Sequence, residues 1–496
     1  MRPATRTQGD LNMRRSAVPL ALLGSVLLGF IGEWLFFEAE PGLNVPLWTG
    51  LVGSVSVLLL RRQGLAVGRA QQVLLLVAWL FTWSLAWRDG SGLHGLSLLA
   101  SALLLGMALY PWSSSPSGGR LREYALLMPM HMGLGMLTGL PALLLQGIEQ
   151  QGGAREGLRA RALRILMGLG LALPFLLLLG ALFASADPVY RRLMQHLLDP
   201  EDLLPRLMLI VLLSGAAAGF WRLLSGFRLP ALSVAFALPR LGALEVGVAL
   251  GLIAGLLSSF VFVQIRYLFG GASLVALTPG LTYAAYAREG FGQLVAASAV
   301  ALPMLLAFHA LLDRRRREGL RLFRILAGLL IGLILIIMAS AGYRLWLYQQ
   351  AYGLTEARFY GAAFLLWLGW TLLWFAITVL AVQREGRFAF GSAVAFLLLV
   401  VLLHGLNPDA RIADLNIRRA LEGKPLDTAY MASLSADALP TVLSLLNRLP
   451  EPARAELLEH LRRHPVRAGI RSWREWNGSR MRARAELERL FGQGKA

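Results

Sequence analysis

The chain has 496 residues, of which 56% are hydrophobic and only 16% are charged, and its formal net charge is +19. Soluble domains carry about 25% charged residues, and here the apolar residues come in blocks of roughly 20, the length that crosses a ~30 Å hydrocarbon core. This composition excludes an ordinary soluble domain, and the lack of cysteine excludes disulfides, thiolate metal sites and cysteine nucleophiles. We expect an all-α fold, a polytopic α-helical membrane protein.

The first apolar run extends from Ala17 to Phe37. It is longer than the hydrophobic region of an ordinary signal peptide, and no small-x-small cleavage site follows it, so we interpret it as a retained first span. Further runs of spanning length lie at 43–60, 72–87, 93–112, 162–184, 207–224, 245–268, 291–312, 322–342, 360–382 and 388–406. The pattern predicts about eleven spans in a transmembrane helical domain over 1–406.

One more apolar run, 124–148, is ambiguous because it holds Pro129, Pro141 and four glycines. Short cytoplasmic loops carry an excess of Arg and Lys. The basic run Arg314–Arg317 lies on the same side as most other loop arginines only if 124–148 does not cross the membrane. We therefore expect 124–148 to be interfacial or re-entrant, the N-terminus to be cytoplasmic and the C-terminus extracytoplasmic.

From Asn407 onward the chain becomes hydrophilic, and we expect residues 407–496 to form a small extracytoplasmic helical tail domain. Asn407 is a suitable N-cap, with Pro408 at the first helical position. Pro450 and Pro465 separate further helical stretches. The positive charge of this tail predicts a solvated helical surface, with contact to lipid headgroups as the alternative.

Polar residues gather near the predicted outer ends of several spans. Gly353 can end one helix in a left-handed conformation, and Thr355 can cap the next. Glu33 lies in the outer quarter of the first span and needs a partner there, for which Arg266 is a candidate. The predicted outer cluster consists of Glu33, Asp187, Arg266, Tyr283, Tyr286, Arg288, Glu289, Arg344, Tyr352, Glu356 and Arg358.

Two interpretations of this outer cluster stay open, a structural collar of ion pairs and caps or a ligand-binding cavity. In either case an unpaired arginine near the hydrocarbon is costly. We therefore expect a carboxylate within ion-pair reach of Arg344 or Arg358. The candidate carboxylates are Glu356, Glu289, Asp187 and Glu33.

Five stretches carry a resemblance to a known family: ASADPVY, TYAAYAREGFGQL, YGLTEARFY, NPDARIADLNIRR and LDTAYMASLSADALP. In this order, over roughly 160–445, they resemble a bacterial multi-pass inner-membrane family catalogued as a domain of unknown function (the forty-one-fifty-three and forty-one-seventy-three DUF group). The resemblance implies an integral protein of the bacterial inner membrane. It implies no reaction and no catalytic residues.

No motif for nucleotide binding, for a hydrolase nucleophile or for a zinc protease occurs in the sequence. We therefore expect no cofactor, no metal and no catalytic residue. The leading hypothesis is a non-enzymatic sensor or envelope-complex subunit, with membrane lipids as partners and a possible envelope protein bound through the tail. We expect no nucleic-acid partner, because the arginines of the membrane part lie in loops between spans.

Two alternatives come from other functional classes. A secondary transporter of a small solute needs polar groups near the bilayer midplane, and Ser258, Ser259 and His309 are the best candidates. A membrane enzyme that acts on lipid or glycan could use Asp187 or Glu289 as a base.

Overall fold

The computed structural model describes residues 8–112, 123–151, 179–180, 182–183, 185–188, 190, 203–226, 241–276, 291–313, 317–382, 384–463 and 471–492. Within these ranges the protein is all-α, and the only β-type pairing is an isolated bridge between Leu241 and Leu312. The expectation of an all-α fold is therefore confirmed.

In the part of the chain that the structure describes, eleven helices are long and apolar enough to cross a membrane. They are α1 (Gln8–Phe36), α2 (Asn44–Arg62), α3 (Arg69–Trp87), α4 (Ser91–Leu109), α5 (Met128–Gln151), α8 (Leu203–Leu224), α9 (Ala243–Ala276), α11 (Phe291–Leu311), α12 (Arg317–Tyr352), α13 (Glu356–Phe375) and α14 (Glu385–Leu406). At 1.5 Å per residue, a helix of about 20 residues covers the ~30 Å hydrocarbon core. The protein is thus a multi-pass membrane protein.

The structure has eleven candidate spans and the sequence predicted about eleven, but the two sets differ in one member. The predicted span 162–184 falls almost wholly outside the described residues. By length and composition alone, Met128–Gln146 in α5 also qualifies as a span.

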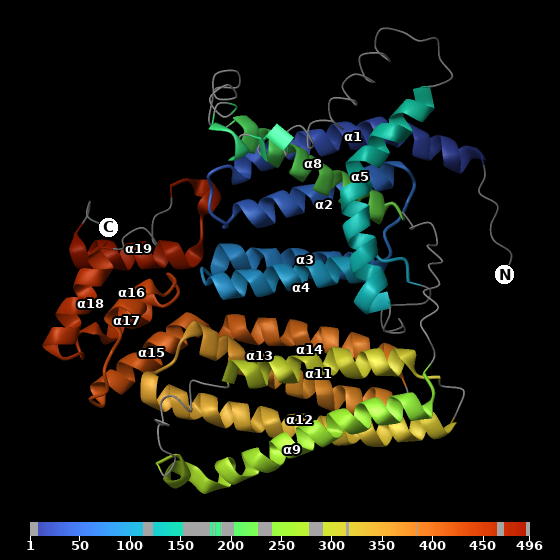
Figure 1. Cartoon of the computed structure of the whole chain (residues 1–496). Helices are drawn as coiled ribbons and strands as arrows, with labels where there is room; N and C mark the ends of the chain where they lie inside the picture. Colours follow the sequence, from blue (N-terminus) through green and yellow to red (C-terminus); the bar gives the residue numbers. More distant parts are fainter. Residues whose placement is uncertain are drawn as a thin grey trace.

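The helices form two groups that lie side by side in Figure 1. One group contains α1, α2, α3, α4, α5 and α8, and the other contains α9, α11, α12, α13 and α14; contacts between α4 and α14 join them. The C-terminal helices lie at one end of this bundle, which we call the tail side, and α1 begins at the other end, which we call the opposite side (Figure 1).

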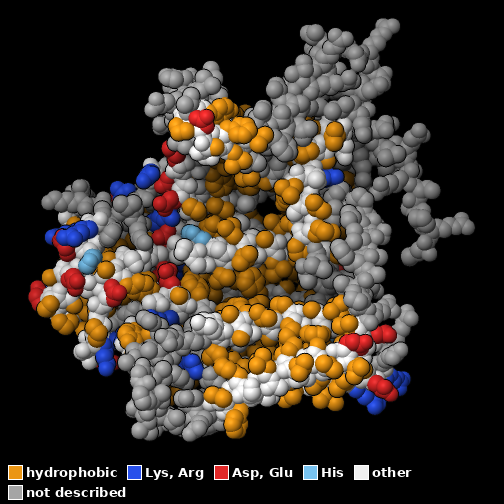
Figure 2. All heavy atoms as spheres, viewed as in Figure 1, with side chains coloured by type: hydrophobic (Ala, Val, Ile, Leu, Met, Phe, Trp, Pro, Cys, Tyr) orange, Lys and Arg blue, Asp and Glu red, His pale blue; other side chains and the backbone are white. Residues whose placement is uncertain are grey.

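Each group has its own apolar core. Phe323, Phe375 and Leu330 are fully buried in the α9–α14 group, whereas Leu60 and Leu223 are buried in the first group. The outward surface of the spanning helices is also hydrophobic, and Figure 2 shows charged side chains gathered near the ends of the molecule. A large exposed apolar surface of this kind marks contact with a membrane rather than with water.

Helix α5 lies across the ends of its neighbours at the opposite side (Figure 1). Met128, at its start, packs with Met107 near the end of α4. Leu143, towards its end, packs with Val18 of α1 and Trp221 of α8, which also lie near the opposite side. Both ends of α5 thus contact the same end of the bundle, and the expectation that 124–148 does not cross the membrane stays a prediction.

A pair of glycines permits the crossing of α5 and α8. A Cβ atom built on Gly139 would lie 2.3 Å from the Cα atom of Gly219, a distance that no side chain can occupy. Small residues at such contacts let two helix backbones approach closely. The two glycines therefore fix α5 against the half of α8 that is nearest the opposite side.

The tail consists of α15 (Pro408–Leu421), α16 (Thr428–Ser433), α17 (Leu439–Leu446), α18 (Glu451–Arg463), the short 3₁₀ turn η5 (Trp473–Glu475) and α19 (Gly478–Phe491). Its core includes Ile412, Ile417 and Leu457. The predicted cap is confirmed, since the side chain of Asn407 accepts from the N–H of Ala410 and Pro408 opens α15. Leu354, in the turn between α12 and α13, belongs to the same core, so the tail packs directly on the bundle.

The natural lack of cysteine makes the position of α5 directly testable. We expect single cysteines introduced as Glu123→Cys and Gln146→Cys to react with a membrane-impermeant maleimide from the same side as Arg62→Cys. A cysteine introduced as Glu422→Cys in the tail should react only from the other side. Labelling of the first two from different sides would show that α5 crosses.

Candidate functional site

The predicted outer cluster is only partly described by the structure. Tyr283, Tyr286, Arg288 and Glu289 lie outside the described residues, and the side chain of Arg266 is not described either. The described members do not gather around one cavity. They divide between the end of α1, an exposed segment around residue 187 and the turn between α12 and α13.

At the end of α1, Glu33 forms an ion pair with Arg206 of α8. The distance between Oε1 and Nη1 is 3.3 Å, and the guanidinium of Arg206 also lies 4.2 Å from the centre of the Phe37 ring. The sequence analysis did not name Arg206 as a partner. Asp187 is exposed, and its carboxylate accepts from the N–H of Tyr190.

The turn between α12 and α13 is held by the tail. Gly353 has φ +79°, as predicted for a left-handed helix end. Asn416 of α15 pairs with both backbone groups of Leu354 at 2.8 Å. A Cβ atom on Gly353 would lie 2.4 Å from Oδ1 of Asn416, so glycine is needed both for its conformation and for this close approach.

Thr355 occupies the N-cap position of α13, as predicted, but the expected side-chain cap is absent. Instead the N–H of Glu356 donates to the hydroxyl of Tyr430 in the tail, at 2.9 Å. At the end of α12, Arg419 donates to the carbonyls of Gln350 and Ala351. The tail thus satisfies helix-end groups that local residues leave open.

The two arginines of this region have different surroundings. Arg358 donates to the carbonyl of Gly353 and stacks 4.0 Å from the centre of the Tyr348 ring; Tyr348 in turn contacts Tyr352. Within the described ranges, no carboxylate forms an ion pair with Arg358. Arg344 is buried at 8% exposure, and its predicted carboxylate partner stays a prediction.

A buried charge network, which we call the junction, joins the tail to the turn between α3 and α4. Nη1 of Arg88 lies 3.2 Å from Oδ1 of Asp437, and Nε of Arg480 lies 2.6 Å from Oδ1 of Asp89. Oδ2 of Asp437 also accepts from the N–H groups of Asp89 and Gly90, at 2.7 and 3.1 Å. Two opposite-sign pairs, each linking the bundle to the tail, therefore meet at one turn.

Further bonds extend the junction to neighbouring elements. Asn477 caps α19 by accepting from two N–H groups of that helix, and it donates to the carbonyls of Leu85 and Arg88. Nη2 of Arg88 donates to the carbonyl of His404 on α14. Nη1 of Arg480 lies 2.9 Å from Glu40, next to α2, in an ion pair without hydrogen-bond geometry. The junction therefore contacts three separate parts of the bundle.

The junction residues were not among the predicted site residues, although the sequence holds a signal for them. Arg88 and Asp89 are adjacent residues of opposite charge in a very short connection between two spans. Such a short connection has no need of two charged residues, so their presence is a signal. Asp437 lies within one of the five resembling motifs. Nothing in the sequence shows that these groups, almost 350 residues apart, come into contact.

A second buried carboxylate, Asp409 at the start of α15, lies beside the junction. It is 2% exposed; its Oδ2 accepts from the N–H and hydroxyl of Ser435, while Oδ1 has no hydrogen-bond partner. Burial raises the pKa of Asp409 from 3.8 to about 6, the nearby charges of Glu356 and Asp437 add to the rise, and the Ser435 bonds oppose it.

Among the described residues, no group of three or more His, Asp and Glu side chains could hold a metal ion.

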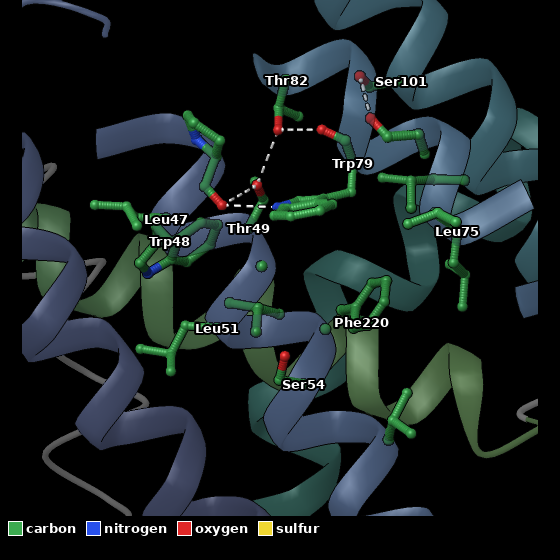
Figure 3. Close-up of a pocket in the computed structure, with 18 of the residues that line it drawn as sticks. Leu47, Trp48, Thr49, Leu51, Ser54, Leu75, Trp79, Thr82, Ser101 and Phe220 are labelled. Carbon is green, nitrogen blue, oxygen red and sulfur yellow. Dashed lines mark hydrogen bonds between the residues drawn. The ribbon is translucent and has the colours of Figure 1, made fainter. Parts of the chain in front are cut away.

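An apolar cavity of about 830 Å³ extends along α2 inside the membrane-spanning part, between α2 and the helices α3, α4, α5 and α8. We call it the α2 cavity. Its lining reaches from Pro46, near the tail side, to Arg61, near the opposite side. Leu47, Leu51 and Phe220 contribute to its apolar walls (Figure 3).

Four polar side chains in the α2 cavity donate hydrogen bonds to backbone carbonyls of the protein itself. Thr49 donates to the carbonyl of Val45, Thr82 donates to that of Trp79, and the Trp79 indole donates to Pro46. Ser101 donates to the carbonyl of Ala78. Figure 3 shows the bonds of Trp79, Thr82 and Ser101. Because these groups already have partners within the protein, the cavity presents mainly hydrocarbon to an occupant.

Breaking one junction pair should weaken the docking of the tail. Asp437→Asn leaves Arg88 buried without a counter-charge, and removal of one partner from a buried pair costs about 3–5 kcal/mol. We expect faster release of the tail by limited proteolysis of the purified full chain and a lower unfolding midpoint. Glu459→Gln, which removes a partner from the exposed Arg463–Glu459 pair, should change little, since such pairs contribute about 0–1 kcal/mol. Equal resistance of both variants would contradict a stabilising role for the junction.

The raised pKa of Asp409 predicts a pH dependence of tail stability. Between pH 4 and 6 the folded protein binds a proton that the unfolded chain has released, so stability falls as pH rises through this window and then levels off. Asp409→Asn should remove this component and make the protein more stable than wild type above pH 6. Thermal unfolding from pH 4 to 8, with Asp414→Asn on the same helix as the control, measures the difference. Parallel pH profiles for wild type and Asp409→Asn would count against it.

Comparison of the sequence with known proteins identifies one protein family. A family model described as "Domain of unknown function (DUF4153)" matches residues 75–445, whereas no curated protein and no solved structure matches. The matched region begins within α3, earlier than the roughly 160–445 indicated by the motifs, and it includes Arg88, Asp89 and Asp437 of the junction. The chain is therefore a multi-pass membrane protein that belongs to the DUF4153 family.

Proposed function

We propose that this protein is a non-enzymatic membrane protein that binds a long-chain, lipid-like molecule in the α2 cavity and acts as a sensor or envelope-complex subunit. The observation that carries this proposal is an apolar cavity of about 830 Å³ within the spanning helices. Ligand sites in proteins are typically apolar hollows of ~300–1,000 Å³, and this one has no charged side chain except at Arg61.

The shape of the α2 cavity favours an extended occupant. From Pro46 to Arg61 the helix rises about 22 Å at 1.5 Å per residue, which is comparable with a long acyl chain. Membrane lipid is as apolar as the cavity wall, so burial of hydrocarbon by itself does not favour binding. Selectivity must then come from the fit of the chain and from Arg61, whose cation suits an acidic headgroup.

The arginines at the opposite side of the bundle support the proposed orientation in the membrane. Exposed arginines at the opposite side include Arg61, Arg62, Arg69, Arg317 and Arg384. The excess of cytoplasmic Arg and Lys in membrane proteins supports a cytoplasmic N-terminus and an extracytoplasmic tail. The resembling family supports the bacterial inner membrane.

The tail can respond to a ligand in the cavity, because α3 lines the cavity and its last residues contact the tail at the junction. Leu75, Trp79 and Thr82 line the cavity, and Arg88 follows Thr82 by less than two helical turns. A ligand that binds more tightly when α3 is in one of two positions shifts the equilibrium towards that position. The size of this shift is set by the difference in the ligand's affinity for the two states, and the junction moves with α3. The exposed surface of the tail is then available to an envelope protein partner.

The two alternative functions have less support. The mid-span polar groups named for a solute transporter lie outside the α2 cavity: Ser259 donates to the carbonyl of Leu256, and His309 packs against Phe323 and Phe375. For a membrane enzyme, the candidate base Asp187 is an exposed carboxylate that accepts from the N–H of Tyr190, and it lies outside the α2 cavity.

A glycine in the cavity wall allows the proposal to be tested without disturbing the fold. Gly53 lines the cavity, and a Cβ atom there would meet no atom within 4 Å. Gly53→Leu should fill the space and weaken binding of the fluorescent fatty acid cis-parinaric acid by about tenfold or more, the usual effect of misfit in an apolar pocket. Energy transfer from tryptophan measures this binding.

Gly95→Leu on α4 is the matched control, because Gly95 is exposed and its Cβ position is also open. We expect this variant to bind as wild type does. If the fatty acid binds equally well to wild type, Gly53→Leu and Gly95→Leu, the α2 cavity is not the binding site.

A further inference from the structure

A second hollow of about 720 Å³, which we call the junction groove, lies between α3 and α14 at the tail side. Its walls include Trp83 and Trp87 of α3, Val401 and Gly405 of α14 and Trp476 of the tail. Trp87, Val401 and Trp476 are each 42–57% exposed. The bundle and the tail thus contribute opposite walls of one apolar groove.

The junction groove has a cationic edge. Gly478, at the start of α19, lines the groove, and the exposed Arg482 donates to the Gly478 carbonyl at 3.1 Å and to the Ser479 hydroxyl at 3.2 Å. The same hydroxyl donates to Asp437 of the junction. Arg482 therefore holds a positive charge beside the groove and has further N–H donors available.

We propose that the junction groove binds an anionic phospholipid that bridges the bundle and the tail. One acyl chain lies between α3 and α14 against the indole rings, and the phosphate lies at Arg482. This site is separate from the α2 cavity and does not depend on the function proposed for it.

Three features support a lipid as the occupant. The groove opens between two helices of spanning length, Arg69–Trp87 and Glu385–Leu406, so it faces the acyl chains of the bilayer. Indole rings prefer the boundary between hydrocarbon and headgroups. A guanidinium binds phosphate through paired hydrogen bonds, which makes the edge of the groove complementary to an acidic headgroup.

A lipid in the groove contacts Trp87 of the bundle and Trp476 of the tail together. A ligand that binds only the docked form stabilises that form by mass action. The proposed lipid therefore strengthens the docking of the tail, in addition to the ion pairs of the junction.

The test uses the full-length chain in detergent, with phosphatidylglycerol as the anionic probe and phosphatidylcholine as the zwitterionic one. Native mass spectrometry counts bound lipid, and thermal unfolding measures stabilisation. We expect wild type to retain phosphatidylglycerol and to gain several degrees in its unfolding midpoint, with less gain from phosphatidylcholine. Gly405→Leu should lose both effects, because a Cβ atom there meets nothing within 4 Å and the side chain fills the groove.

Further variants separate the chain site from the headgroup site. Arg482→Gln should remove the preference for phosphatidylglycerol and keep the weaker binding of phosphatidylcholine. Trp476→Ala should reduce binding of both lipids, whereas Trp473→Ala, an exposed tryptophan of the same turn that instead contacts Trp34, should not. Gly53→Leu, which changes the α2 cavity and not the junction groove, should retain the phosphatidylglycerol effect. Failure of the α2 cavity proposal can therefore be told apart from failure of this one.

Two outcomes would overturn the proposal. The first is equal phosphatidylglycerol binding and stabilisation in wild type, Gly405→Leu and Trp476→Ala. The second is a dimer that Gly405→Leu dissociates into monomers without a change in bound lipid, which would make the groove a contact between two copies of the chain.

Discussion

The arrangement at the tail side depends on how Asp437 is satisfied. This carboxylate is 5% exposed, and it accepts from the Arg88 guanidinium, the N–H groups of Asp89 and Gly90 and the Ser479 hydroxyl. A buried charge is tolerated only where such donors surround it. Because the donors come from the α3–α4 turn and from α19, the carboxylate is satisfied only when the tail is docked in one position.

Tail side chains also satisfy polar backbone groups at the ends of other bundle helices. In a spanning helix the last carbonyls and first N–H groups have no partner within the helix, and the tail supplies partners for several of them. Asn416, Arg419 and Tyr430 act at the α12–α13 turn, and Asn477 acts at the end of α3. The tail is therefore bound by polar contacts at defined helix ends, with an apolar contribution from Leu354.

The two hollows share one structural element, α3. One side of this helix lines the α2 cavity through Trp79 and Thr82, and Trp83 and Trp87 line the junction groove. Its final residues enter the junction. A movement of α3 would therefore change the walls of both hollows and the contacts of the junction. In this way α3 connects the membrane part with the tail.

The sequence alone determined the class of the protein, because runs of about 20 apolar residues have few stable structures other than membrane helices. It also determined local features whose cause is local: the left-handed Gly353, the Asn407 cap and the start of the tail at Pro408. Only the tertiary structure decided which charges meet, since Arg88 and Asp437 are brought together by the docking of the tail and not by any periodicity. For the same reason Tyr430 of the tail, rather than the Thr355 side chain, bonds an N–H at the start of α13, and Arg206 is the partner of Glu33. Both hollows likewise arise from the packing of separate helices, so no single stretch of sequence contains them.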